Sequence, residues 1–88
     1  MELEIGQVAF SKAGRDKGNP FIILSLESTR DGDFAYLADG KTRSIAAPKK
    51  KKIKHLQPVN HIDKELARAI IEGRHIKDSD IKKCLTAF

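Results

Sequence analysis

The chain has 88 residues, a length that fits one small domain. Its hydrophobic content of 40% is enough for a compact core and excludes wholesale disorder. The formal net charge of +5 favours a polyanionic partner such as nucleic acid. The single cysteine, Cys84, excludes an internal disulfide, and no apolar stretch resembles a membrane span or a signal peptide. These features predict a soluble, cytoplasmic protein. The positive charge would also suit an anionic membrane surface, but no membrane binding is expected, because neither C-terminal helix pairs a strongly basic face with a large apolar face.

Short apolar runs separated by turn signals predict five strands in the first half of the chain. Asp39-Gly40 is the strongest hairpin signal, because a type I′ turn needs positive φ at both central residues. Five short strands so closely spaced predict a small closed or nearly closed barrel, since closure removes exposed strand edges. The predicted strands are residues 5–10, 21–26, 34–38, 41–45 and 53–56.

The pattern changes to a helical period after Pro58. Asp63 is the expected N-cap of a first helix that ends at Gly73. Asp78 or Ser79 would cap a second helix, whose apolar stripe contains Cys84. The predicted fold class is therefore α+β and mainly β, with a β unit over residues 1–58 and a helical pair over residues 59–88 packed on it.

The excess positive charge belongs to the β unit. Residues 1–58 contain 11 Lys and Arg against 7 Asp and Glu, whereas residues 59–88 contain 6 against 5. A polyanion is therefore expected to bind the β unit rather than the helices.

The loop over residues 11–20 combines basic residues with two glycines. Glycine lets backbone N–H groups approach phosphate oxygens closely, while Lys and Arg neutralise the phosphate charge. The alternative is an ordinary solvated loop, in which Asp16 pairs with Arg15 or Lys17. The run from Lys49 to Lys52 is a second basic segment, and alternation in an extended chain prevents its lysines from all facing one surface. Some of these lysines could instead keep a strand edge soluble.

Part of this pattern resembles a known family. Gly6-Gln-Val-Ala-Phe-Ser-Lys-Ala-Gly-Arg-Asp-Lys-Gly18 and the apolar run after it look like a KOW motif. With Leu37-Ala-Asp-Gly-Lys-Thr-Arg43 and the lysine segment from Pro48 to Leu56, the chain resembles small bacterial KOW-domain RNA-binding proteins, relatives of an archaeal and eukaryotic large-subunit ribosomal protein. The resemblance implies an SH3-like barrel that binds RNA, often ribosomal RNA, through its loops. Asn19-Pro20 departs from the motif, where a basic residue and glycine are common.

The candidate RNA contacts combine the loop, the lysine segment and the basic residues after the Asp39-Gly40 turn. Gly14 and Gly18 would be turn or close-approach positions, and the charged residues would contact phosphates. The alternative is a protein-interaction module, because KOW domains also occur in transcription elongation factors of the NusG type; its interface would be the C-terminal helices or a barrel groove. The candidates are Ser11, Lys12, Gly14, Arg15, Lys17, Gly18, Lys41, Arg43, Lys49, Lys50, Lys51, Lys52 and Lys54.

Aromatic residues are few, and the strand pattern assigns Phe34 and Tyr36 to the core rather than to base stacking. Recognition of RNA shape and phosphates is therefore favoured over sequence-specific reading of bases. The three histidines and one cysteine do not have metal-ligand spacing, and no nucleotide-binding glycine pattern is present. The sequence thus predicts a non-catalytic protein without a metal or another cofactor.

Overall fold

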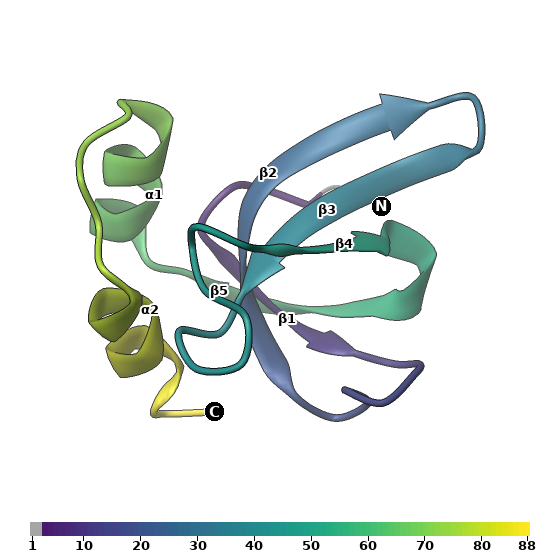
Figure 1. Cartoon of the computed structure of the whole chain (residues 1–88), viewed down its shortest axis with the longest axis horizontal. Helices are drawn as coiled ribbons and strands as arrows, with labels where there is room; N and C mark the ends of the chain where they lie inside the picture. Colours follow the sequence, from purple (N-terminus) through teal and green to yellow (C-terminus); the bar gives the residue numbers. More distant parts are fainter. Residues whose placement is uncertain (1–2) are drawn as a thin grey trace.

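In the computed structural model, which describes residues 3–88, the chain forms a five-stranded antiparallel sheet with two helices at its C-terminal end (Figure 1). The fold is mainly β, as the sequence predicts. The strand order is β4-β3-β2-β1-β5, so β4 and β5 are the edges. No helix within residues 3–88 is long and apolar enough to cross a membrane. The elements are β1 (Gln7–Ser11), β2 (Pro20–Thr29), β3 (Gly32–Ala38), β4 (Lys49–Lys52), the 3-10 turn η1 (Ile53–His55), β5 (Leu56–Ile62), α1 (Lys64–Ile71) and α2 (Asp78–Leu85).

One side of the sheet, here called the core face, carries the first hydrophobic cluster. Alternation along each strand sends every second side chain to this face. Ala9 on β1 lies opposite Phe21 on β2, and Ile23 lies opposite Leu37 on β3. The members of this cluster are Leu3, Ala9, Phe21, Ile23, Ala35, Leu37 and Leu56, and all are buried.

The opposite side, here called the helix face, is covered at one end by α1 and α2 (Figure 1). The strand residues under the helices are Val8 of β1, Ile22 of β2 and Ala38 of β3. They form a second cluster with Leu66 of α1 and with Ile81 and Leu85 of α2. The apolar stripes predicted for the helices are therefore used to cover the sheet.

The segment over residues 41–45, predicted as a strand, is a loop. Asp39-Gly40 does not form a type I′ turn, because no residue other than glycine has positive φ in the described chain. Instead, the Asp39 carboxylate accepts hydrogen bonds from the backbone N–H groups of Lys41 (2.9 Å) and Arg43 (2.8 Å). This local bonding replaces strand pairing, and the chain rejoins the sheet only at β4.

The last strand also differs from its prediction. Residues 53–55 form the 3-10 turn η1, and β5 continues through Pro58 to Ile62. Pro58 lies opposite Ala9, at a position where β5 is a sheet edge. A proline is tolerated there because an edge strand has one unpaired side.

The first helix begins as predicted, because Asp63 accepts a hydrogen bond from the Leu66 N–H at 3.0 Å. The second helix has Lys77 as its N-cap residue instead of Asp78 or Ser79. The Asp78 carboxylate bonds elsewhere, to the backbone N–H of Ile45 at 2.7 Å. This bond ties the loop after β3 to the start of α2.

Gly40 provides a test of this docking. Its φ is +79°, and a Cβ there would collide with the carbonyl oxygen of Asp78. Gly73 has a similar φ of +71°, but a Cβ there would meet nothing. We expect Gly73→Ala to cost about 1–2 kcal/mol of unfolding free energy, from backbone strain alone, and Gly40→Ala clearly more. Urea denaturation of both variants measures the difference; equal losses would contradict the docked loop.

Candidate nucleic-acid interface

The carboxylate of Asp16 is the centre of a polar cluster that joins the basic loop to β4. Its Oδ1 accepts hydrogen bonds from the Ser11 hydroxyl (2.7 Å) and the Lys51 ammonium (2.8 Å). Lys51 also donates to the carbonyl oxygen of Ala13 at 2.7 Å. Lys49 lies 3.1 Å from Oδ2 as an ion pair, without hydrogen-bond alignment. Asp16 therefore pairs with the lysine run, rather than with Arg15 or Lys17.

Strand register explains why these two lysines reach Asp16. Lys49 lies opposite Leu37 and Lys51 opposite Ala35, so both side chains are on the core face. Ser11 and Lys51 are only 3% and 9% exposed, since the loop folds over them. The lysine run is thus divided between two faces, as its alternation predicts.

Two opposing influences act on the pKa of the Asp16 carboxyl: burial, which disfavours the charged form, and its polar contacts, which favour it. Burial by itself would raise the pKa of Asp16. The hydrogen bonds from Lys51 and Ser11, together with the ion pair to Lys49, outweigh burial and hold the pKa of Asp16 well below its ordinary range. The carboxylate is therefore ionised at neutral pH and neutralises part of the lysine run.

The basic loop is fixed at its base and exposed at its tip. The Ser11 N–H donates to the carbonyl of Asn19 at 3.0 Å, and the Gly18 N–H donates to the carbonyl of Ser11 at 2.8 Å. Gly18 has a φ of +88°, and a Cβ there would meet nothing, so glycine is needed for the turn itself. Arg15 and Lys17 are exposed at the tip, together with Gly14.

Three other lysines line one pocket of about 310 Å³ at the end of the sheet. Lys12 follows β1, Lys52 ends β4 and Lys54 belongs to η1. None of the three forms an ion pair with a residue in the range 3–88. Asp31 and Asp33 line the same pocket and reduce its positive charge without pairing to these lysines.

Backbone hydrogen bonds and strand pairing determine the relative positions of the three pocket lysines. The Lys12 N–H donates to the carbonyl of His55 at 2.8 Å, which joins the end of β1 to η1. Phe34 lies opposite Lys52, which places the end of β4 beside the start of β3. The sheet therefore brings Lys12 to Lys52 and Lys54, which lie far from it in the sequence.

Lys41 and Arg43 are not part of this pocket. Lys41 lines another pocket of about 500 Å³, together with Asn19, Pro20 and Lys82 of α2. Arg43 is exposed and forms no ion pair with the residues that the structure describes. These two candidates lie on the loop that docks on α2, apart from Lys12 and its neighbours.

The prediction that Phe34 and Tyr36 are core residues is wrong. Both share the helix face with Ala38, but they lie beyond the helices and are only half-buried. The ammonium of Lys50 lies over their rings, 4.6 Å from the Phe34 centroid and 5.8 Å from the Tyr36 centroid. Glu27 pairs with Lys50 at 3.0 Å and accepts a hydrogen bond from the Tyr36 hydroxyl at 3.2 Å.

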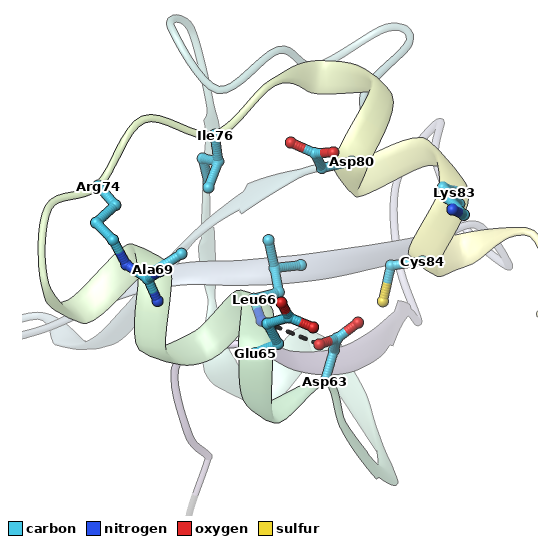
Figure 2. Close-up of a pocket in the computed structure, with 9 residues that line it drawn as sticks. All are labelled: Asp63, Glu65, Leu66, Ala69, Arg74, Ile76, Asp80, Lys83 and Cys84. Carbon is cyan, nitrogen blue, oxygen red and sulfur yellow. Dashed lines mark hydrogen bonds between the residues drawn. The ribbon is translucent and has the colours of Figure 1, made fainter.

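A groove between α1 and α2 has the opposite electrostatic character (Figure 2). Its volume is about 510 Å³, and its lining contains the carboxylates of Asp63, Glu65 and Asp80 against two basic side chains. Cys84 lies in the same groove, where burial and then the nearby Asp63 carboxylate raise the pKa of its thiol. This groove is unfavourable for a phosphate and for a reactive thiolate.

The chain matches no protein-family model, and no curated protein is similar to it at a significant level.

Replacing Asp16 tests the polar cluster. Asp16→Asn leaves the buried Lys51 ammonium without a counter-charge, so we expect a loss of about 3 kcal/mol of unfolding free energy. Asp33→Asn is the matched control, because Asp33 is exposed and has no ion pair within residues 3–88. Urea denaturation at neutral pH gives both values, and equal small losses would refute a structural role for Asp16.

The pH dependence follows from the lowered pKa of Asp16. An aspartate in the unfolded chain has a pKa of about 3.9, whereas the folded group stays ionised to lower pH. Below that value the unfolded state binds more protons, so stability falls as the pH decreases. The stabilisation is present above about pH 4 and is lost as the pH falls through the folded pKa. In thermal melts, Asp16→Asn should flatten this acid decline; an unchanged slope would contradict the assignment.

Proposed function

We propose that the chain is a non-catalytic cytoplasmic RNA-binding protein that contacts ribosomal or other folded RNA through phosphates. The observation that carries the proposal is a set of three lysines, Lys12, Lys52 and Lys54, that line one pocket and form no ion pair with any residue from 3 to 88. A phosphate can accept hydrogen bonds from several ammonium groups without displacing an existing ion pair.

The loop tip extends this surface. Arg15 and Lys17 are exposed and carry two further charges close in sequence to Lys12. Ser11, Lys49 and Lys51 are left out of the proposed contact, because Asp16 already engages them. Their role is to hold the loop in position for RNA. Gly14 and Gly18 allow the turns of this loop.

The resemblance to KOW-domain proteins supports the same function and suggests the finer architecture. We infer that the five strands form an SH3-like barrel, in which the contact between Asp16 and Lys51 joins the loop after β1 to the distant strand β4. RNA rather than DNA, and ribosomal RNA in particular, is what this resemblance favours.

A protein partner at the α1–α2 groove is a second candidate. The lining of this groove combines the apolar side chains of Leu66, Ala69 and Ile76 with carboxylates and two basic groups, a mixture that suits a protein surface. The groove is acidic and lies on the helices, so such a partner would be compatible with RNA bound at the lysine pocket.

Charge reversal at the pocket tests the RNA proposal. The variant Lys12→Glu/Lys54→Glu should weaken binding to a folded RNA hairpin by roughly tenfold or more. The control Lys64→Glu/Arg68→Glu changes the net charge equally, but on the exposed surface of α1. Fluorescence anisotropy with labelled RNA measures both affinities. Equal weakening by the two variants would indicate a net-charge effect and would overturn the proposed site.

Salt dependence provides an independent test. Five phosphate contacts, from Lys12, Arg15, Lys17, Lys52 and Lys54, predict a log–log slope of about −3.5 to −4.5 for the binding constant against salt concentration. The variant Lys12→Glu/Lys54→Glu should have a slope that is less negative by about 2. A slope near zero for the unmodified protein would exclude phosphate neutralisation as the mechanism.

A further inference from the structure

The uncovered end of the helix face combines aromatic rings with lysines. Phe34 and Tyr36 are neighbours on this face of β3, and Lys50 and Lys52 lie opposite them on β4. The helices cover Ala38 on the same strand, but they do not reach the two rings. Half-buried rings that remain accessible beside ammonium groups satisfy the requirements for stacking a nucleobase and holding its phosphate.

We infer that this aromatic face, Phe34, Tyr36, Lys50 and Lys52, binds a single-stranded segment of RNA by base stacking. The inference rests on the proposed RNA-binding function and adds the kind of RNA that this face would take. Aromatic side chains on a sheet surface stack successive unpaired bases, while lysines on the next strand bind the phosphates between them.

Lys52 connects this face to the lysine pocket. Its ammonium lies 5.9 Å from the Phe34 centroid, and the same side chain lines the pocket with Lys12 and Lys54. A strand of RNA that leaves the pocket can therefore continue over Phe34 without crossing a neutral surface. The arrangement suits a junction, with folded RNA at the pocket and an unpaired stretch on the aromatic face.

Glu27 regulates access to the rings. Its carboxylate holds Lys50 over Phe34 and accepts the Tyr36 hydroxyl hydrogen bond. A phosphate can replace Glu27 as the partner of Lys50, because both are anionic acceptors, and the ammonium would then leave the ring free for a base. Glu27→Gln removes the competing charge and should tighten binding of a single strand.

The probe is a short oligouridylate, compared with an abasic ribose-phosphate oligomer of the same length and with oligoglutamate. Tyr36 is the only tyrosine of the full chain, which has no tryptophan, so its ring signals report on this face alone. Oligouridylate should shift the ring protons of Tyr36 and Phe34 upfield in NMR spectra, because a stacked base imposes its ring current. Equal shifts with the abasic oligomer or with oligoglutamate would overturn the inference.

Substitution of the rings gives the second arm. Phe34→Leu/Tyr36→Leu should weaken oligouridylate binding about tenfold or more, whereas Tyr36→Phe should retain it. Phe88→Leu is the control, because Phe88 is another solvent-accessible aromatic side chain, 40% exposed, but follows α2 and lies outside the aromatic face. Unchanged oligouridylate affinity in the folded double variant would overturn stacking. If the Lys12/Lys54 variant still loses hairpin binding in that case, the proposed function stands without this inference.

Discussion

The partly buried carboxylate of Asp16, with its ion pairs to Lys49 and Lys51, is the interaction on which the rest of the surface depends. It lies in the loop after β1, but its partners Lys49 and Lys51 belong to β4, two strands further across the sheet from the β1–β2 pair. The contact holds the loop against the sheet edge and provides a counter-charge for a lysine that would otherwise be buried alone. It adds a side-chain link between the loop and β4 to the backbone hydrogen bonds that fix the base of the loop and the pairing that places β4 beside β3.

This constraint divides the basic residues into groups with different roles. Ser11, Lys49 and Lys51 stabilise the loop from the core face. Lys12, Lys52 and Lys54 line a pocket and have no ion pair in the described part of the chain, and Lys50 lies on the helix face over aromatic rings. The lysines from 49 to 54 look equivalent in the sequence but have different roles. Some stabilise the loop, others are available to phosphates, and Lys50 lies over aromatic rings, because alternate residues of a strand face opposite sides of the sheet.

The mainly β first half, the two C-terminal helices and the Asp63 cap are predictable from the sequence, since they depend on local periodicity and turn chemistry. The strand that pairs with β3 is not predictable in this way. The Asp39 carboxylate accepts hydrogen bonds from the backbone that follows it, so the paired strand is Lys49–Lys52 and not residues 41–45. For the same reason the aromatic face is not predicted from the sequence, because Phe34 and Tyr36 lie opposite Lys52 and Lys50 only when β4 is the strand next to β3. The alternation Phe-Ala-Tyr-Leu is apolar on both faces, so it does not say which face is covered.

The most direct test of this division is NMR observation of the lysine side-chain ammonium groups during titration with a folded RNA that carries a single-stranded extension. The ammonium signals of Lys12, Lys52 and Lys54 should shift on binding, and Lys50 should shift as it leaves Glu27. Those of Lys49 and Lys51 should remain in place, because Asp16 retains them. Uniform shifts along the whole run from Lys49 to Lys54 would contradict the account.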